Sequence, residues 1–227
     1  MTRTISREAV ARDGERAYPS ITRLNGSYVR VELLDSETHA EDLFISSHLE
    51  NKARVVWNFL PHGPFGTIAE FVAWLEGFAE SDGRVFYAII DEASRKAQGM
   101  ASLSNIRVDA GALELGYIWF APPLQQTRAA TEAIYLLLQH LFESLQYRRI
   151  EWMSDASNER CTQAAERFGF QREGTLYQHM IVKGRNRDAA AYSLLDGEWP
   201  GMATRFAAWL APQNFDASGQ QRERLAR

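Results

Sequence analysis

Cysteine is nearly absent from this sequence, since Cys161 is the only one among 227 residues. A single cysteine excludes an intrachain disulfide and favours a reducing, cytoplasmic setting. The chain also lacks any apolar run near the ~18 residues that a membrane-spanning helix needs. Its polar first residues lack the apolar stretch of a signal peptide. We therefore expect a cytoplasmic protein without a membrane partner.

Positive charge is not in excess either, because 25 Lys and Arg residues face 29 Asp and Glu residues, which gives a formal net charge of -4. Surfaces that bind nucleic acid usually carry a basic patch, so we expect no nucleic-acid partner. The five histidines show no spacing typical of metal ligands, and we expect no metal. The 45% of hydrophobic and 24% of charged residues are typical of a globular protein with a full core.

The length favours one domain, which we place at residues 19–211. Polar and charged residues dominate the two ends of the chain. We therefore expect a polar N-terminal arm at 1–18 and a mobile, charged C-terminal tail at 212–227. Two-fold dimers are the commonest oligomers, so a homodimer is our starting expectation for the oligomeric state.

Hydrophobic periodicity predicts the elements of this domain. Alternating or continuous apolar patterns predict strands over 28–34, 85–90, 97–106, 113–120, 149–154, 175–183 and 189–195. Apolar spacings of three and four predict helices over 36–50, 71–78, 126–145, 161–168 and 200–210, the first of them capped by Ser36. A meander followed by a β-α-β crossover indicates the α/β (α+β) class, with a mixed, mostly antiparallel sheet flanked by helices.

The junction at 116–131 is the most informative part of the chain. A strand pattern runs through two prolines into a long helix that begins near Gln126, Thr127 and Arg128. A helix start carries unpaired N–H groups and about half a positive charge, which makes it a natural seat for a phosphate or pyrophosphate. The small residues Ala129 and Ala130 would let such a ligand come close to the backbone. A plain capped helix is the alternative interpretation.

Three segments together resemble the GNAT acetyltransferase superfamily, and within it most of all the ribosomal-protein N-terminal acetyltransferases. They are ELGYIWF at 114–120, similar to the family's bulged strand, QQTRAATEA at 125–133, similar to its pyrophosphate loop, and DASNERC at 155–161 with ERFGF at 166–170, similar to its Asn-x-x-Ser and Gly-Phe segment. The resemblance covers residues 20–199. It implies a GNAT-like fold and acetyl transfer from acetyl-CoA to a primary amine, by direct attack in a ternary complex. The acceptor would be a protein N-terminus or a small amine.

The resemblance also implies a set of cofactor-binding residues. Backbone groups at Ile118, Trp119 and Phe120 would lie along the pantetheine arm, and Asn158 would contact the same arm. The pyrophosphate would be held by Gln125, Gln126, Thr127, Arg128, Ala129, Ala130 and Thr131. Each has a structural alternative, because aromatic residues usually pack in cores and asparagine is a good helix cap.

Catalysis by this mechanism needs a base for the amine and an acid for the departing thiolate. Glu114 is the candidate base, with Glu151 and Asp155 as alternatives, and each can equally be a salt-bridged carboxylate. Cys161 replaces the family's serine and is the candidate acid, although a buried cysteine often serves only packing. A nucleophilic role for it is less favoured, because no activating base adjoins it in the sequence.

Two departures from the family pattern bear on this assignment. Arg128 stands where the family has its first loop glycine, so it either reaches a CoA phosphate or narrows the loop. Ala165 stands where many relatives have the tyrosine that protonates the thiolate. A non-catalytic acyl-CoA-binding module therefore stays an alternative, as does a partner-binding protein in which the loop is only a capped helix.

Two further regions could serve the acceptor. His179 and the basic segment 183–188 lie near a predicted hairpin end and could meet an acidic substrate or the 3′-phosphate of CoA, although such a turn is more often only solvated. Trp57, Phe59, Phe65 and Trp74 make the region after the first helix aromatic, which suits an apolar substrate or a core.

Overall fold

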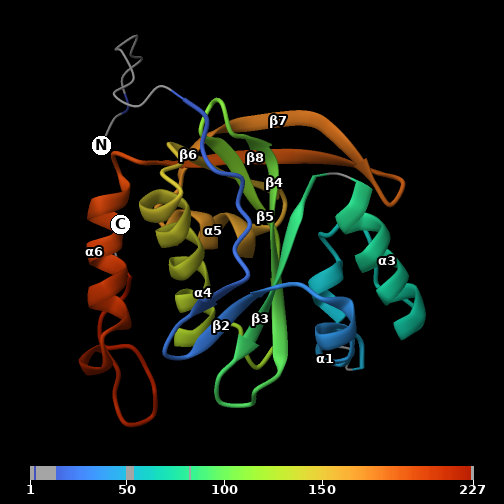
Figure 1. The fold of residues 1–227 in the computed structure, drawn as a ribbon, viewed down its shortest axis with the longest axis horizontal. Helices are drawn as coiled ribbons and strands as arrows, with labels where there is room; N and C mark the ends of the chain where they lie inside the picture. Colours follow the sequence, from blue (N-terminus) through green and yellow to red (C-terminus); the bar gives the residue numbers. More distant parts are fainter. Residues whose placement is uncertain (1–2, 4–13, 50–53, 82, 226–227) are drawn as a thin grey trace.

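An eight-stranded sheet organises the computed structural model, which describes residue 3 and residues 14–49, 54–81 and 83–225 (Figure 1). The strands are β1 (Arg23–Asn25), β2 (Val29–Leu33), β3 (Val85–Asp91), β4 (Ala97–Arg107), β5 (Ala112–Phe120), β6 (Arg149–Asp155), β7 (Gln171–Val182) and β8 (Arg185–Leu195). Their order across the sheet is β1-β2-β3-β4-β5-β6-β8-β7. Neighbouring strands are antiparallel except β5 and β6, which are parallel. The predicted mixed, mostly antiparallel sheet is confirmed.

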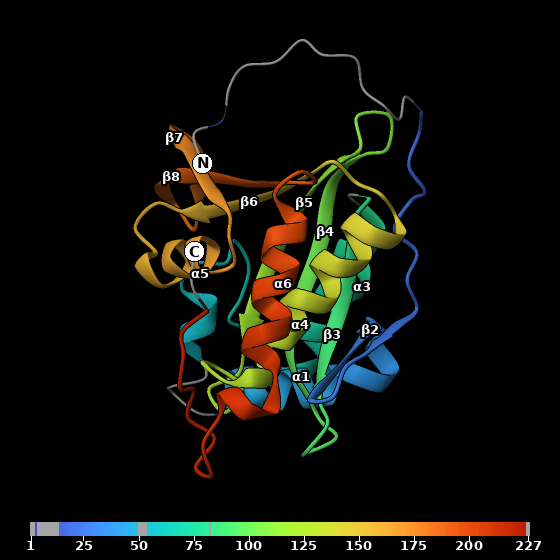
Figure 2. The same ribbon diagram turned by 90° about the vertical axis from the view of Figure 1, so that its left-hand side faces the viewer.

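Helices cover both faces of this sheet. They are α1 (Ser36–His48), α3 (Ile68–Ser81), α4 (Arg128–Gln139), α5 (Glu159–Arg167) and α6 (Trp199–Leu210), with 3-10 segments η1 (Val55–Trp57) and η3 (Pro212–Asn214) and a π-helical turn η2 (His140–Ser144). Figures 1 and 2 show α1 and α3 on one face and α4 and α6 on the other. Within the described ranges, no helix has the length and apolar character that would let it cross a bilayer.

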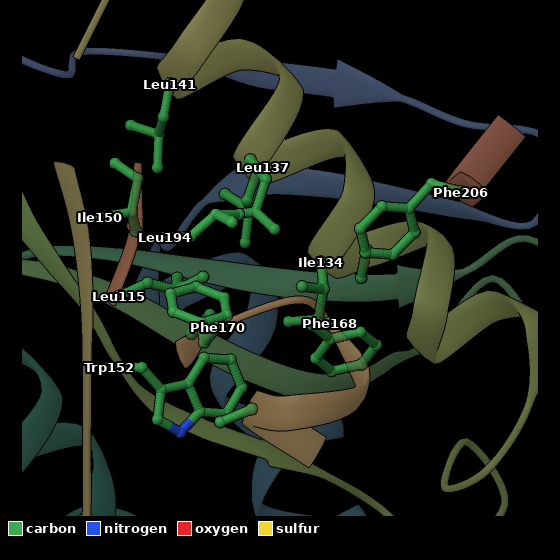
Figure 3. Packing of buried hydrophobic residues seen from close by; sticks show 14 of the residues in the cluster. Leu115, Ile134, Leu137, Leu141, Ile150, Trp152, Phe168, Phe170, Leu194 and Phe206 are labelled. Carbon is green, nitrogen blue, oxygen red and sulfur yellow. The ribbon is translucent and has the colours of Figure 1, made fainter. Parts of the chain in front are cut away.

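The larger of two apolar cores lies between the sheet and α4, α5 and α6 (Figure 3). Ile134 and Leu137 of α4 and Phe206 of α6 are fully buried there, beside Leu115 of β5. Trp152 of β6 packs against Phe170, with 5.3 Å between the two ring centroids. Each such side chain contributes about 1.5–3 kcal/mol on burial. This core therefore fixes α4 and α5 firmly beside the central strands β5 and β6.

The smaller core lies on the opposite face, under α1 and α3. Leu43 of α1, Phe71 of α3 and Met100 of β4 are fully buried in it. Trp57 of η1 is also fully buried, and its indole N–H donates to the carbonyl oxygen of Ser47 at 3.2 Å. This anchor fixes the position of the segment that follows η1, which becomes a wall of the cavity described below.

The structure shows which residues cap the starts of α4 and α1. Thr127 caps α4, because its side-chain oxygen accepts from the N–H of Ala130 at 3.2 Å. The cap of α1 is Asp35, which accepts from the N–H of Thr38 at 2.7 Å, and the predicted cap Ser36 is instead the first helical residue. Aspartate and serine cap about equally well, so two adjacent candidates cannot be separated by residue type alone.

The C-terminal tail packs onto the domain, which differs from the mobile tail that we expected. The side-chain amide of Asn214 donates to the carbonyl of Trp209 at 3.0 Å, and Leu225 is only 6% exposed within the larger core. The polar composition of the tail gives no sign that Asn214 and Leu225 anchor it to the domain. The predicted arm at 1–18 is described only at Arg3, which pairs with Glu173 and Glu198, and from residue 14 onward. The remainder of that arm lies outside the described residues.

Candidate active site

The two parallel strands at the centre of the sheet separate part-way along their length. β5 and β6 pair in register at three positions, which are Ala112 with Arg149, Leu113 with Ile150 and Glu114 with Glu151. Between the described residues of these strands the ladder does not continue beyond that point. Ladder hydrogen bonds are what hold neighbouring strands about 4.8 Å apart, so the sheet opens from Glu114 onward.

A bulge in β5 lies at the start of this opening. Tyr117 and Ile118 together oppose a single residue of β4, Ala101. Tyr117 has a φ of 48°, in the left-handed region that residues other than glycine seldom adopt. A bulge leaves its extra residue out of the ladder and re-aims the backbone. Main-chain N–H groups at this point are therefore available to a ligand in the opening.

A cavity of about 540 Å³ fills the opening between the strands. Trp152 and Leu115, which line it, belong to the larger core on the α4 face. Glu114 and Met153, which also line it, alternate with them along the strands and so face the α1 side. The cavity thus passes through the sheet, and two ligands entering from opposite faces would meet inside it.

The walls on the α1 side come from two segments that are distant in sequence. They include Phe59, Leu60 and Pro61 after η1, and Leu176, His179, Met180 and Arg187 of the β7–β8 hairpin. The ammonium group of Lys183, at the tip of the hairpin, donates to the carbonyl oxygen of Trp57 at 2.7 Å. This bond ties the hairpin to η1 and encloses the cavity from that side. Figure 1 shows the hairpin reaching across to the α3 side of the sheet.

Glu114 is well placed to act on a ligand that enters from the α1 side. It lines the cavity and forms no hydrogen bond or salt bridge with another described residue. Burial raises the pKa of its carboxyl, and the nearby carboxylate of Glu151 raises it further, against the opposing effect of Arg84, Arg187 and Arg107. A half-buried carboxylate with a raised pKa and a free position in front of it suits a general base.

Cys161 lines the same cavity from α5, on the opposite face of the sheet. The indole N–H of Trp152 donates to its sulfur at 3.3 Å. Burial raises the pKa of the Cys161 thiol, so the thiol stays protonated at neutral pH. A protonated thiol can donate a proton, whereas a nucleophilic cysteine needs a lowered pKa.

The two alternative bases are already occupied. Glu151 forms a salt bridge with Arg107 at 2.9 Å and accepts a hydrogen bond from Arg149 at 2.8 Å, and it also lines the cavity. Asp155 accepts from both the N–H and the hydroxyl of Ser157. Their oxygens already have partners, whereas those of Glu114 have none among the described residues, so the geometry favours Glu114 as the base.

The predicted pyrophosphate loop forms the start of α4. Gln125 and Gln126 are exposed, and Gln126 has a φ of 61°. Ala129 and Ala130 are buried, and Thr131 is buried where its hydroxyl accepts from Arg167 of α5 at 3.1 Å. The first N–H groups of a helix have no intrahelical acceptor, so this turn offers donors to an anion beside α5. These loop residues do not line the 540 Å³ cavity itself.

Arg128 points across the helix start rather than out into solvent. Its guanidinium lies 3.4 Å from the ring centroid of Phe215 and 4.7 Å from that of Tyr28, and it donates to the Tyr28 hydroxyl. The side chain therefore connects the start of α4 to the turn between β1 and β2 and to the C-terminal segment. Its backbone N–H remains part of the exposed helix start.

The remaining predicted cofactor residues divide into two groups. Ile118 and Asn158 line the cavity, and Asn158 also caps α5 by accepting from the N–H of Cys161 at 3.2 Å. Trp119 is 4% exposed in the smaller core, and Phe120 packs against the larger one, so neither side chain reaches the cavity. Ala165, at the position of the missing tyrosine, is fully buried.

The aromatic region after α1 also divides. Trp57 is fully buried and Phe65 and Trp74 pack against the smaller core, whereas Phe59 lines the cavity and is 37% exposed. His179 of the predicted basic cluster lines the cavity as well. Among the described residues, no group of three His, Cys, Asp or Glu side chains is arranged to hold a metal ion.

Sequence reasoning missed one feature beside the cavity and one that lines it. The hydroxyl of Tyr117 lies 3.2 Å from Nδ1 of His62, and burial lowers the pKa of that histidine, as do Arg84 and Lys183. A neutral imidazole at this place can accept a proton through the tyrosine. Arg187 lines the cavity with a side chain only 13% exposed. In the sequence, the Gly-Tyr pair after Glu114 pointed to the Tyr117–His62 contact. The basic segment at 183–188 pointed to Arg187.

Comparison with known proteins gives a consistent result. A family model described as an acetyltransferase (GNAT) domain matches residues 30–171. The comparison with curated proteins finds no match. Among solved structures, a GCN5-related N-acetyltransferase from Brucella melitensis is 43% identical with a TM-score of 0.89, and 93% of this chain and 95% of that chain are covered.

Two further structures carry the same fold. A probable acetyltransferase of the GNAT family from Chromobacterium violaceum is 37% identical with a TM-score of 0.79, and 88% of this chain and 99% of that chain are covered. A spermidine N-acetyltransferase from Vibrio cholerae, solved in complex with CoA and spermine, is 20% identical with a TM-score of 0.61, and 77% and 99% are covered. The family model and the two closer structures establish that the chain belongs to the GNAT acetyltransferase family.

Proposed function

We propose that this protein transfers the acetyl group of acetyl-CoA to the primary amine of a small molecule or a protein N-terminus. The amine attacks the thioester directly in a ternary complex. The observation that carries the proposal is the cavity through the sheet, which has Glu114 on one face and Cys161 on the other. A structure of the same fold contains CoA and a polyamine, which supports CoA and an amine as the two ligands here.

The start of α4 would hold the pyrophosphate of the cofactor through the N–H groups of residues 125–131, with Asn158 and the backbone of Ile118 further along the arm. Acetyl-CoA supplies the activated acetyl group. The bulge at Tyr117 and Ile118 provides N–H groups for the thioester carbonyl, and preorganised donors of this kind stabilise the charge that develops on that oxygen.

The proton transfers then follow from the two sides of the sheet. The amine nitrogen forms a bond to the acetyl carbon, and Glu114 accepts the proton that the amine loses. The carbon–sulfur bond breaks, and the departing CoA thiolate takes the proton of the Cys161 thiol. A reducing cytoplasm, which the proposal assumes, keeps this lone cysteine in its thiol form. A second candidate base is His62, acting through Tyr117 at 3.2 Å.

The test is release of free thiol from acetyl-CoA in the presence of amines, with the acetylated product identified by mass. Polyamines, amino acids and peptides with a free N-terminus would be tried. Thiol release that depends on an amine supports the proposal. Saturable binding of acetyl-CoA without turnover on any amine would instead identify a non-catalytic acyl-CoA-binding module.

Cys161→Ala should lower kcat by about 10²-fold, at the lower end of what a general acid contributes, with little change in acetyl-CoA affinity. Cys161→Ser keeps a weaker acid in place, so its kcat should lie between those of the wild type and Cys161→Ala. Mass spectrometry of the wild-type protein after exposure to acetyl-CoA should detect no acetyl group on Cys161. An unchanged kcat in Cys161→Ala would mean that the cysteine serves only packing. A covalent acetyl group on Cys161 would establish a ping-pong mechanism.

Arg128→Ala should weaken acetyl-CoA binding by about fivefold, because one cation–π brace is worth roughly 1 kcal/mol. The loop then loses its contacts with Phe215 and Tyr28. Calorimetric titration of the variant against wild type measures this, with Arg160→Ala, an exposed residue on α5, as the control. Equal affinities would mean that the brace does not order the loop.

A further inference from the structure

Arg187 is a largely buried cation, and few nearby groups compensate its positive charge. Its side chain is 13% exposed, and Nε makes no hydrogen bond to any residue that the structure describes. The nearest carboxylate oxygen, of Asp155, lies 4.0 Å from Nε, at the outer limit of a salt bridge. Asp155 already accepts two hydrogen bonds from Ser157 through its other oxygen. A terminal nitrogen of Arg187 lies 3.9 Å from the sulfur of Met180, which is a weak acceptor.

Two other arginines near the cavity, Arg149 and Arg107, have close carboxylate partners. Arg149 donates to both oxygens of Glu173 at 2.8 and 2.6 Å and to Glu151 at 2.8 Å. Arg107 pairs with Glu151 at 2.9 Å. Buried guanidinium groups normally acquire partners of this quality, because burying an unpaired charge is costly. Of these three arginines, Arg187 is the one without a carboxylate oxygen closer than 4.0 Å in the described part of the chain.

Glu114 is the matching feature of opposite charge. Both side chains line the cavity, and Arg187 alternates along β8 with Ala190 of the larger core, which places it on the α1 side together with Glu114. The two are close enough to influence each other electrostatically, yet they form no salt bridge within 4.0 Å. The small side chains of Ala189 and Ala191 leave room on the same face of β8.

From this arrangement we infer that the acceptor is a small amine that carries a carboxylate on the same molecule. Its ammonium group faces Glu114 and its carboxylate is held by the guanidinium of Arg187, whose planar fork matches a carboxylate in two hydrogen bonds. The inference rests on the proposed function and narrows its acceptor. Apolar atoms of Met153, Leu176 and Met180 favour an aliphatic side chain on the acceptor.

Other acceptors fit this site less well. A polyamine would bring a second positive charge towards Arg187, and like charges in a half-buried site repel. The N-terminus of a protein presents a neutral peptide group next to its amine, so Arg187 would remain without an anion. Charge complementarity therefore discriminates among acceptors that share the same amine.

The experiment compares three acceptors that differ only in the second group. L-leucine, L-leucinamide and 3-methylbutylamine are assayed by thiol release from acetyl-CoA, and the β- and γ-amino acid homologues of leucine test the spacing of the two charges. We expect one of the amino acids to exceed the amide and the plain amine by about 10- to 100-fold in kcat/KM, which is the range for a hydrogen-bonded charge pair. Equal rates for all three groups would overturn the inference.

Variants locate the effect. Arg187→Met should raise KM for the preferred amino acid by about 10- to 100-fold. The rate with 3-methylbutylamine should change much less, because that amine has no carboxylate for Arg187 to bind. Arg187→Lys should restore part of the preference. Arg185→Met, an exposed position two residues earlier on the same strand, should change neither value. An equal loss on every acceptor would assign Arg187 a structural role and sink the inference.

A binding measurement separates this inference from the proposed function. Calorimetric titration of the preferred amino acid into CoA-saturated protein needs no turnover. Binding that weakens in Arg187→Met supports the carboxylate site even if no amine is acetylated, an outcome that would remove only the catalytic proposal. Acetylation of spermidine or a peptide N-terminus, with no binding or turnover of any amino acid, would remove only the carboxylate site. Absence of both would remove both.

Discussion

Replacing Glu114 with glutamine should lower kcat for acetyl transfer by about 10³-fold, within the range that a positioned general base contributes. Glutamine has nearly the same shape but cannot accept the proton of the attacking amine. The affinity for acetyl-CoA should hardly change, because Glu114 faces the α1 side of the sheet and we propose that the cofactor enters from the α4 side. Steady-state thiol release measures kcat, and calorimetric titration measures the affinity.

The pH profile tests the same assignment independently. In the wild-type protein kcat/KM should rise as Glu114 loses its proton, with an inflection above the ordinary glutamate range, because burial raises the pKa of this carboxyl. Glu114→Gln should lack that limb, whereas Glu151→Gln should keep it despite the loss of its salt bridges. A limb that survives in Glu114→Gln would assign the base elsewhere, with His62 behind Tyr117 as the next candidate.

Glu114→Gln should also make the protein more stable at neutral pH. A carboxyl with a higher pKa in the folded than in the unfolded state binds its proton more tightly when folded. Its contribution to stability is therefore greatest at low pH and is lost as the pH rises from the ordinary value of 4.5 through the raised folded pKa. Calorimetric Tm values should show a gain for the variant at pH 7 that shrinks below pH 4. A lower Tm at pH 7 would contradict the burial argument.

Replacing Glu132 with alanine should destabilise the fold by about 3 kcal/mol, the upper range for hydrogen bonds to a charged group. Glu132 lies on α4, is 6% exposed, and its carboxylate accepts from three consecutive backbone N–H groups, of Ser27, Tyr28 and Val29, at 2.6 to 3.0 Å. These bonds fix the turn between β1 and β2 onto α4, whose first turn is the proposed cofactor loop. Their removal leaves buried donors without acceptors.

Differential scanning calorimetry should record this loss as a fall in Tm of about 6–12 °C for a domain of this size. Glu41→Ala, at an exposed position of α1, is the control and should change stability by no more than about 0.5 kcal/mol. Gly26→Ala gives a second test, because an added Cβ would lie 2.4 Å from a carboxylate oxygen of Glu132. A Tm within 2 °C of wild type for Glu132→Ala would mean that water replaces the carboxylate at no cost.

The elements of this fold were predictable because their signals are local. The continuous apolar run of β3 follows from burial on both faces of that strand, and the apolar stripe of α4 follows from burial on one face of that helix. The three-residue β1 and the anchoring of Leu225 were missed, because a short edge strand and one apolar residue in a polar tail leave no periodic signal. The choice of Asp35 over Ser36 as a cap likewise depends on the backbone path and not on residue type.

The candidate site was predictable where it follows the family motifs and not where it depends on long-range packing. Glu114, Ile118, Asn158 and Cys161 belong to the motif segments, and the structure brings all four to one cavity. Arg187 reaches that cavity because β8 inserts between β6 and β7, an arrangement that no local pattern encodes. Which side chain of a basic segment is buried depends on register, since a one-residue shift turns every side chain to the other face.

Titration with acetyl-CoA followed by thermal unfolding tests most directly whether the opened sheet is an acetyl-CoA site. Ligand at 100 times its Kd stabilises the folded protein by about 2.7 kcal/mol, which corresponds to a Tm increase of about 5–11 °C here. We predict a saturable increase of that size with acetyl-CoA and none with ATP at the same concentration. The absence of a shift at millimolar acetyl-CoA would contradict the proposed function at its first step.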